Sequence, residues 1–224
     1  PTSATTCDAT AWAIDADDVV CWNVNKPAPP TIRHFKSPRE VGISNNYICA
    51  LDDTGLHCWF PHDNLEITPP ALKNPQHISS GQNVLCAVDD GGLVCWGHGE
   101  NRAFRLVEVP KLQHRPLKVT LGLRHGCALS EVAVECWYWE DGGKLVLGKG
   151  PALDKPTAVS VNQDTSRWNT QEKHWEGFAS VCAMDSRGVN CWNMVTGETL
   201  PIPVPLSRPT QVKMYWSSEA FAVT

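Results

Sequence analysis

The sequence lacks the features that mark nucleic-acid-binding and membrane-spanning proteins. It contains no run of lysine or arginine and carries a net charge of −5, so it has no basic stretch to neutralise a phosphate backbone. It also has no uninterrupted apolar stretch of about eighteen residues, the length that a membrane-spanning helix needs. We therefore expect no nucleic-acid partner and no insertion into a membrane.

Signatures of catalysis and metal binding are missing as well. The sequence has no G-x-S-x-G, no H-E-x-x-H and no phosphate-binding glycine loop, the motifs that place nucleophiles, zinc ligands and phosphate-binding backbone. Its eight histidines form no H-x-H or H-x-x-x-H pair. We therefore expect no enzymatic activity, no metal site and no cofactor.

Cysteine is abundant but widely spaced. There are ten cysteines, and the closest pairs have eight residues between them, whereas structural zinc sites use pairs about two to four residues apart. An even count favours five disulfides formed in an oxidising compartment, so we expect a secreted, periplasmic or cell-surface protein. The chain opens at Pro1-Thr2-Ser3 with no start methionine and no apolar signal segment, which indicates a processed or excised chain.

Internal repetition predicts the fold. Four segments share the pattern C-A-φ-x6-C-W, where φ is apolar, and they begin at Cys49, Cys86, Cys127 and Cys182. A fifth copy has Trp12 in place of its first cysteine, and a sixth begins at Phe221 and stops after Thr224. Seventeen prolines and sixteen glycines along the chain leave little room for long helices. The chain is therefore predicted to be all β.

Each repeat reads as a hairpin that a disulfide could close. An apolar strand leads into an Asp/Gly turn and a second strand ends on Cys-Trp, so cysteines nine positions apart face each other across the ladder. This predicts the pairs Cys49–Cys58, Cys86–Cys95, Cys127–Cys136 and Cys182–Cys191. Cys7 and Cys21 remain, and the even number of cysteines makes them partners. Cys7 lies five residues before Trp12, which holds the position of the first cysteine in the other repeats, so this disulfide requires the N-terminal strand to depart from the regular blade.

Each repeat is about 40 residues long and is expected to form three or four short strands. A sheet this small can bury its two apolar faces only against neighbouring repeats, which is typical of propeller blades. We predict one β-propeller domain over residues 1–224 with five to six blades. The expected repeats span about 4–38, 39–75, 76–115, 116–170, 171–210 and a partial 211–224.

The fuller pattern V-x-x-x-G-x4-C-A-L-x-x-x-G-x-x-C-W resembles the repeat of the regulator-of-chromosome-condensation propeller family in a cysteine-bearing form. Similar repeats occur in secreted bacterial proteins and in crinkly-type receptor ectodomains. The resemblance runs from Cys7 to Trp192 and a following half copy. It implies the fold but not one function, because such propellers include an exchange factor, a β-lactamase inhibitor, and receptor or adhesive ectodomains.

Two recurring residue types have structural explanations. The tryptophan after each second cysteine is predicted to pack between blades or on its own disulfide rather than to line a sugar site. The recurring acids Asp15, Asp52, Asp89 and Asp185 are predicted to serve hairpin turns, because no D-x-D-x-D-G calcium loop surrounds them.

The irregular repeat holds the predicted binding residues. The step from Cys127 to Cys182 is 55 residues, against 37 to 41 for the others, and we interpret 138–175 as an insertion. Aromatic side chains beside polar ones suit sugar stacking or hot-spot contacts to a protein. The predicted ligand-binding residues are Tyr138, Trp139, Arg167, Trp168, Asn169 and Trp175. The alternative is that Trp139 and Trp175 belong to flanking strands and pack inward.

The sequence favours an extracellular binding module of the adhesin, lectin-like or receptor-ectodomain kind, with a glycan or protein ligand on another surface. The alternative is a protein inhibitor or scaffold that clamps a partner protein. The incomplete last repeat leaves an unpaired strand edge, so a homo-oligomer formed through that repeat or through regions outside this chain is also an expectation.

Overall fold

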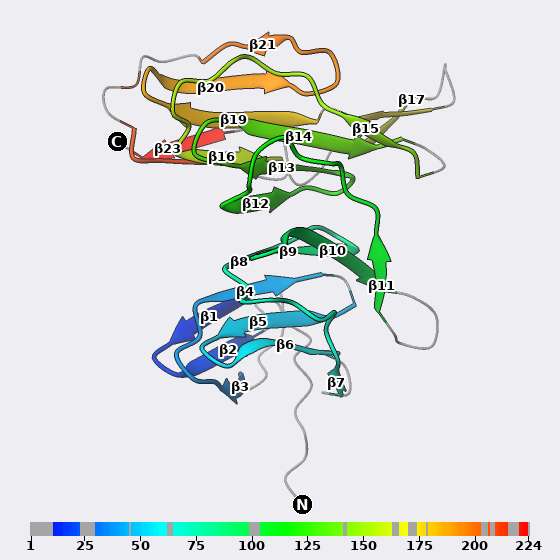
Figure 1. Cartoon of the computed structure of the whole chain (residues 1–224), viewed down its shortest axis with the longest axis vertical. Coiled ribbons are helices and arrows are strands. Elements are labelled where there is room, and N and C mark those ends of the chain that lie inside the picture. The colour runs from blue at the N-terminus through cyan, green and yellow to red at the C-terminus, as the bar shows by residue number, and fades with distance from the viewer. Residues whose placement is uncertain are drawn as a thin grey trace, which may run out of the picture. The chain divides into compact units, whose positions relative to one another are not determined.

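The structure is a computed structural model, and it describes residues 11–22, 30–44, 46–61, 65–98, 104–140, 143–162, 166–169, 174–177, 179–202, 206, 209–214 and 220–223. These residues form β-strands and connecting turns (Figure 1). None of them forms a helix long and apolar enough to cross a membrane. The chain divides into two compact units, 1–107 and 108–224, and the single domain over 1–224 stays a prediction.

Unit 1 contains three antiparallel sheets, which we call blades 1 to 3. Blade 1 consists of β1 (Ala11–Asp15), β2 (Asp18–Trp22) and β3 (Thr31–His34). Blade 2 consists of β4 (Glu40–Ile43), β5 (Ile48–Asp52), β6 (Gly55–Trp59) and β7 (Glu66–Ile67). Blade 3 consists of β8 (His77–Ser80), β9 (Val84–Asp89), β10 (Gly92–His98) and β11 (Phe104–Val107).

Unit 2 contains blades 4 to 6 and one extra hairpin. Blade 4 consists of β12 (Lys118–Leu121), β13 (His125–Leu129), β14 (Val134–Trp139) and β15 (Leu145–Leu147). Blade 5 consists of β16 (Ala158–Val161), β19 (Ser180–Asp185), β20 (Gly188–Asn193) and β21 (Thr199–Leu200). The partial blade 6 is β22 (Gln211–Met214) with β23 (Ala220–Val223), and the extra hairpin is β17 (Ser166–Asn169) with β18 (His174–Gly177).

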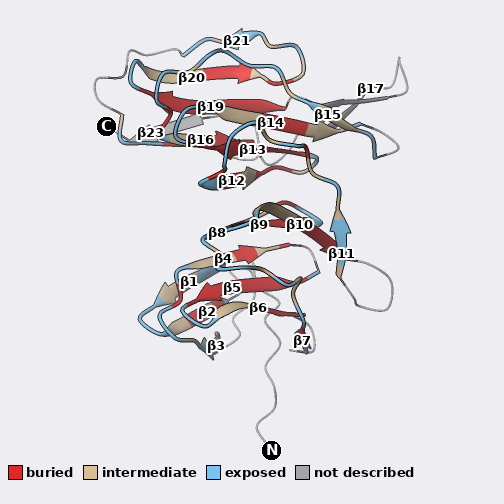
Figure 2. Ribbon diagram, in the orientation of Figure 1, coloured by how far each residue is buried: buried red, intermediate tan, exposed pale blue. Residues whose placement is uncertain are grey.

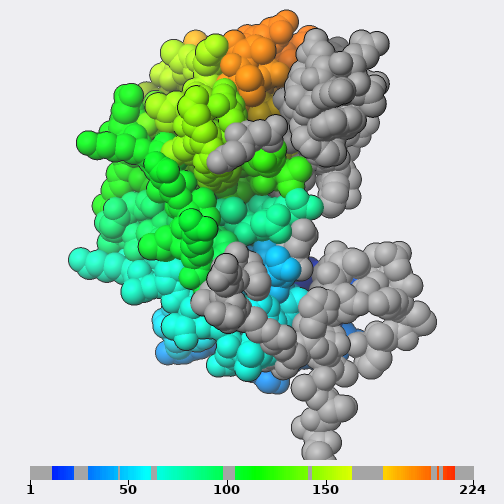
Figure 3. All heavy atoms as spheres, turned by 90° about the vertical axis from the view of Figure 1, so that its right-hand side faces the viewer, coloured from blue at the N-terminus to red at the C-terminus, as the bar shows by residue number. Residues whose placement is uncertain are grey.

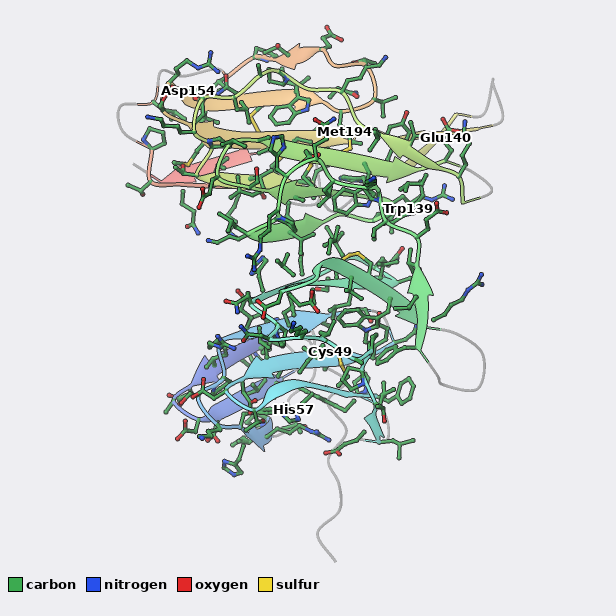
Figure 4. All side chains as sticks on the ribbon, viewed as in Figure 1. Cys49, His57, Trp139, Glu140, Asp154 and Met194 are labelled. Carbon is green, nitrogen blue, oxygen red and sulfur yellow. A yellow bond between two sulfur atoms is a disulfide. The ribbon has the colours of Figure 1, made fainter. Side chains whose placement is uncertain are left out.

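Four of the predicted disulfides are present and staple the second and third strands of blades 2 to 5. Cys49–Cys58, Cys86–Cys95, Cys127–Cys136 and Cys182–Cys191 are direct partners in the strand register, with Cα atoms 4.0 to 4.1 Å apart. Cys49 is labelled in Figure 4. Cys7 lies outside the described residues, so its pairing with Cys21 stays a prediction. Cys21 is buried and lies opposite Trp12 in the ladder.

Glycine recurs where the hairpin turn needs it. Gly55, Gly92 and Gly188 begin the third strand of their blades with φ between 120° and 131°. Side chains with a Cβ rarely adopt this backbone conformation. The Asp/Gly turn signals in these repeats therefore have a backbone cause.

The repeat tryptophans of blades 2, 3 and 5 pack between blades, as the sequence predicts. Trp59, Trp96, Trp137 and Trp192 are 0 to 1% exposed, and the central strands of each sheet are the most buried (Figure 2). Trp96 of blade 3 shares a core cluster with Cys49 and Cys58 of blade 2. Trp192 of blade 5 lies in the same way with Cys127 and Cys136 of blade 4. Each of these two indoles thus belongs to the same buried cluster as the disulfide of the preceding blade, whereas Trp22 of blade 1 is 37% exposed.

The recurring aspartates do more than terminate strands. Asp52 accepts hydrogen bonds from the backbone N–H of Lys36, 16 residues earlier, and of Thr54 in its own turn (3.0 and 2.7 Å). Asp89 accepts in the same way from Lys73 and Gly91 (2.8 and 2.7 Å). Each carboxylate therefore ties its hairpin to the segment that enters the blade.

Blade 4 makes the equivalent tie with a different residue. Ser130 stands where the other blades have aspartate, and the carboxylate comes from Glu135 on β14. Glu135 accepts from the backbone N–H groups of Gln113 and His114 (2.7 and 3.0 Å). The repeat pattern does not reveal Glu135, because this residue directly precedes the second cysteine of its repeat whereas the recurring aspartates lie three residues after the first cysteine.

Replacing Asp52 with asparagine is expected to destabilise unit 1 by about 2 kcal/mol at neutral pH. Burial alone would raise the pKa of Asp52, but hydrogen bonds from the Thr54 hydroxyl and from the backbone N–H groups of Lys36 and Thr54 lower it to about 2. The folded state therefore binds this proton less readily than the unfolded chain does. The contribution of Asp52 to stability is full above about pH 4 and is lost as the pH falls towards 2.

The measurement is urea denaturation of wild type, Asp52→Asn and the control Asp53→Asn at pH 7 and pH 3. Asp53 is the exposed neighbour in the same turn, and we expect its variant to match wild type. An Asp52→Asn protein as stable as wild type at pH 7 would contradict the assignment.

Candidate functional site

The extra residues of the long repeat lie inside blade 5 and not between two blades. In blades 2 to 4 the first and second strands are joined by a two-residue turn, closed in blade 4 by the bond from Gly122 N to His125 O (2.8 Å). In blade 5 the same bond runs from Asn162 N to Ser180 O (3.2 Å), and the residues between them include β17 and β18. The expected insertion over 138–175 is thus corrected: β15 and β16 are ordinary blade strands, and blade 5 begins at Ala158.

The inserted segment leaves blade 5 through a buried neck. Besides the closing bond, Ser180 N donates to Asn162 Oδ1 (2.9 Å) and Met194 N donates to Ala179 O (2.8 Å). Asn162, Ala179, Ser180 and Met194 are at most 5% exposed. Both ends of the inserted segment are therefore held by a packed base.

The segment that follows β15 contacts the neck and the neighbouring end of β20. Lys149 N, just after β15, donates to Met194 O (2.7 Å), and in the space-filling view the chain after β15 lies beside the end of β20 and its following turn (Figure 3). Gly150 lies against the Trp192 indole, whose Nε1 would be 2.7 Å from an added Cβ. Residue 150 must therefore be very small for Trp192 to pack as it does.

Blade 4 packs directly on the neck. A Cβ at Gly122 would lie 2.5 Å from Asn162 O and 2.4 Å from the His125 ring, so only glycine fits between them. His125 is 1% exposed. Its burial lowers its pKa to about 4, against the opposing effect of hydrogen bonds with the Asn162 side chain and backbone. The His125 imidazole that packs beside the neck is therefore neutral at pH 7.

The hairpin places the predicted aromatic residues opposite each other. Trp168 pairs with Trp175, Arg167 with Glu176 and Asn169 with His174. Directly opposed residues belong to the same face of an antiparallel ladder, and successive residues alternate. The two tryptophan positions therefore share one face of the hairpin, and the charged and amide positions share the other.

The hairpin and the end of β14 belong to the same edge of unit 2. In blades 2 to 5 the connection between the first and second strands and the loop after the third strand lie at the same end of the blade, and Figure 1 shows β17 at the edge of unit 2 where β14 ends. The bond from Trp139 N to Arg124 O (2.9 Å) in blade 4 is the counterpart of the Met194–Ala179 bond in the neck. Tyr138 and Trp139 therefore lie at the end of β14, beside the turn between β12 and β13. In blade 5 the corresponding turn is replaced by the segment that contains the hairpin.

Tyr138 and Trp139 themselves lie on opposite faces of β14. Tyr138 packs against the core cluster that contains Val181 and Trp192 of blade 5. Trp139 meets Trp137 edge-on, with ring centroids 6.4 Å apart, and it is labelled in Figure 4 beside Glu140. Both side chains are half-buried. The packing expected as the alternative for Trp139 is therefore present in part, and these two residues do not form one aromatic surface.

The structure brings four of the six predicted binding residues onto one hairpin. Arg167, Trp168, Asn169 and Trp175 lie on β17 and β18, although their side chains lie outside the described part of the structure. The neck residues Asn162, Ala179 and Met194 were missed. The sequence does contain a signal for their place. Ala158–Val161 resembles the first strand of the other repeats, which would put Asn162 at the end of that strand and the inserted segment between it and Cys182.

One cluster in blade 2 has the composition of a catalytic triad but not its geometry. His57 Nε2 lies 2.7 Å from Thr54 Oγ1 and 3.2 Å from Asp52 Oδ1. In a relay the acid and the nucleophile contact different ring nitrogens, whereas here both contact Nε2. Within the described ranges, no group of three or more His, Cys, Asp or Glu side chains is placed to hold a metal ion.

Comparison with known proteins supports the fold. No family model and no curated protein matches the chain. It is similar to the CRINKLY WD40 ectodomain of the receptor kinase ACR4 from Arabidopsis thaliana, with a TM-score of 0.53 and 19% identity over 85% of this chain and 60% of that one. It is also similar to Prp20p from Saccharomyces cerevisiae (TM-score 0.53, 14% identity, 79% of this chain and 54% of that one) and to human WBSCR16 (0.59, 13%, 90% and 66%).

These likenesses define the class: an all-β protein with the blade architecture of β-propellers, stapled within its hairpins by disulfides. Another similar structure contains yeast RCC1 (Prp20), so the expected family resemblance holds at the level of fold. The chain spans 54 to 66% of the length of the three structures compared above. Four disulfides are typical of an oxidising compartment.

Proposed function

We propose that this chain is a protein-binding propeller module of the extracellular space or cell surface, and that the β17–β18 hairpin is its main contact. The observation that carries the proposal is the position of the hairpin: it leaves blade 5 from a buried neck, at the place where blades 2 to 4 have only a two-residue turn. A recognition loop on a rigid base costs less entropy to order when it binds.

The residues of the hairpin suit a protein partner. Trp168 and Trp175 are paired across the ladder and Arg167 lies one position away. Tryptophan and arginine are the side chains that most often dominate protein interfaces. No strand pairs with either outer edge of this two-stranded sheet within the described ranges, and such an edge can add a strand from a partner.

The similar structures agree with this role without assigning a ligand. Prp20p has binding properties to Gsp1p and histones, and yeast RCC1 has been solved in a complex with Kap60. Two other similar structures are receptor-kinase ectodomains from plants. We infer binding rather than catalysis for this chain, and an inhibitor or scaffold that clamps its partner is a special case of the same role. Glycan recognition is the competing proposal.

The test compares wild type with a variant in which 163–178 is replaced by a single leucine. This change restores the two-residue turn of blade 4 and keeps Asn162, Ala179 and Ser180. Oxidised, immobilised protein is incubated with intact cells and with a glycan array. We expect wild type to bind cells and lose this binding when the cells are treated with protease, and we expect the leucine variant not to bind.

Trp168→Ala with Trp175→Ala is the finer variant, and Trp22→Ala is the control, a half-exposed tryptophan in unit 1. Equal cell binding by wild type and the leucine variant would refute the hairpin as the contact. Saturable binding to one glycan that free sugar displaces, together with cell binding that survives protease, would establish the competing lectin function.

A further inference from the structure

Blade 4 places a histidine against the neck of blade 5 where the repeat does not require one. His125 begins β13, two positions before the first cysteine of its repeat, and the other blades have Tyr47, Val84 and Ser180 at this position. The His125 side chain is 1% exposed, and its Nε2 atom has no hydrogen-bond partner among the described residues. A buried titratable group that the repeat pattern does not explain is a candidate for a separate role.

The imidazole and the neck are joined through one residue. His125 Nε2 and Asn162 O each lie 2.5 Å from the place that a Cβ on Gly122 would occupy, so the two atoms are close neighbours. Asn162 also closes the neck: its backbone N–H donates to Ser180 O (3.2 Å), and its Oδ1 accepts from Ser180 N (2.9 Å). A change at the His125 ring therefore acts directly on the residue from which the inserted segment leaves blade 5.

The surroundings of the ring contain no acid among the residues that we place there. Tyr138 of β14 is its cross-strand partner, and Lys118 lies on the same face of blade 4 at the other end of β12. Arg124, the preceding residue, is exposed. The side chains of blade 5 in this cluster are apolar or aromatic: Val159, Val161, Val181, Ala183 and Trp192. Burial in such a place lowers the pKa of His125 to about 4.

Protonation changes what the ring demands of Asn162. A neutral imidazole has one N–H donor and one acceptor nitrogen, whereas an imidazolium has two donors and no acceptor. Nε2 then carries a proton in a buried place, where a charge without a partner is costly. A hydrogen bond from the imidazolium to Asn162, or entry of water to hydrate the charge, competes with the two bonds between Asn162 and Ser180.

We propose that His125 makes the neck sensitive to acid: its protonation breaks the Asn162–Ser180 contacts, loosens the base of the hairpin and releases the bound partner. A hairpin on a packed base is ordered before it binds, and loosening the base restores the entropy cost of ordering it. The release step rests on the proposed function of the hairpin, whereas opening of the neck does not.

The first experiment follows the neck without any partner, by amide hydrogen exchange measured with NMR at pH 7.5 and pH 5.5. The amides of Ser180 and Met194 donate the hydrogen bonds of the neck, and Met194 is labelled in Figure 4. We expect their protection in wild type to fall about tenfold, because the histidine pKa is about 6.5 when the neck is open and about 4 when it is closed. In His125→Gln we expect no such fall.

The amide of Ala183, in the centre of blade 5, separates local opening from unfolding of the whole unit. We expect Ala183 to be better protected than Ser180 at both pH values, because the neck opens locally. His174→Gln is the matched control, since it removes the histidine of the hairpin itself, and its neck amides should keep the wild-type response. Wild type gives a readout that needs no variant: the Ser180 amide shift and the His125 ring should titrate with the same midpoint.

Three results would overturn the opening of the neck. They are equal protection of Ser180 and Ala183, a wild-type response in His125→Gln, and loss of the response in His174→Gln, which would assign the titration to the hairpin.

The second experiment tests release. Cells loaded with wild type at pH 7.5 are washed at pH 4.5, and we expect most of the bound protein to be lost and to bind again at pH 7.5, whereas His125→Gln should stay bound. A neck that opens while wild type stays bound in acid would overturn the release step and leave the hairpin contact intact. Cell binding that does not depend on the hairpin at pH 7.5 would refute the proposed function and with it the release step, but the exchange measurement would still decide whether the neck opens.

Discussion

Replacing Trp96 with alanine is expected to destabilise the protein by about 3 to 5 kcal/mol, the range for removing a large aromatic side chain from a core. Trp96 is 0% exposed and packs in the cluster that contains the Cys49–Cys58 disulfide. Its ring also meets Phe104 edge-on at 6.2 Å, and its backbone carbonyl accepts the Tyr47 hydroxyl from blade 2 (3.1 Å). The cavity would open at the contact between two blades, where neither backbone can collapse into it.

The control is Trp22→Ala, which makes the same change at the same repeat position of blade 1. Trp22 is 37% exposed, so we expect a loss of about 1 kcal/mol. Urea denaturation followed by circular dichroism measures both. Equal losses would contradict the conclusion that the repeat tryptophan stabilises the protein through inter-blade packing.

Trp96→Phe separates ring packing from hydrogen bonding. The Trp96 indole Nε1 is buried with no acceptor among the described residues, and a buried donor without a partner is costly. Phenylalanine leaves a smaller cavity and removes that donor, so we expect this variant to lose clearly less stability than Trp96→Ala. A loss as large as that of alanine would indicate that the indole N–H has an acceptor.

Acidification from pH 6.5 to pH 4 is expected to destabilise unit 2 by up to about 3 kcal/mol through His125 alone. Burial lowers the pKa of His125 from 6.5 to about 4. Between these two values the unfolded chain binds a proton that the folded state does not, so stability rises with pH. The His125 contribution is complete above about pH 6.5 and is lost progressively as the pH falls towards 4.

The variant His125→Gln tests this directly, because glutamine is neutral at every pH. We expect its stability to change less than that of wild type between pH 6.5 and 4.5, whatever its stability at pH 7. The opposite pattern, with His125→Gln following the wild-type pH dependence, would show that His125 is not the titrating group.

The effect matters for binding because of where His125 lies. It packs with Gly122 on Asn162, the residue from which the inserted segment leaves blade 5. We expect protonation of His125 to destabilise the neck, because it places a charge in a buried position. Measurements of hairpin binding are therefore best made above pH 6.5.

The hairpins and their disulfides were predictable because the interactions that form them are local. Cysteines nine positions apart around an Asp/Gly turn fall opposite each other in an antiparallel ladder, as Cys86 and Cys95 do. The burial of Trp59 and Trp96 was also predictable, since a residue that recurs in every repeat faces the same neighbour each time. The place of the insertion was harder to predict. The apolar residues of Ala158–Val161 are a signal for the first strand of blade 5, but this strand pairs with Ser180–Asp185 only across a long interruption.

The sequence by itself thus determined the repeat, the all-β blade architecture and the pairing of four disulfides, since each depends on residues within about ten positions along the chain. Only the tertiary structure decided the rest. It placed the hairpin on the neck of Asn162, Ala179 and Met194, separated Tyr138 from Trp139 on two faces of one strand, and laid Arg33 over Trp59 of the next blade. Each of these results depends on packing between blades, which brings together residues that no local pattern links.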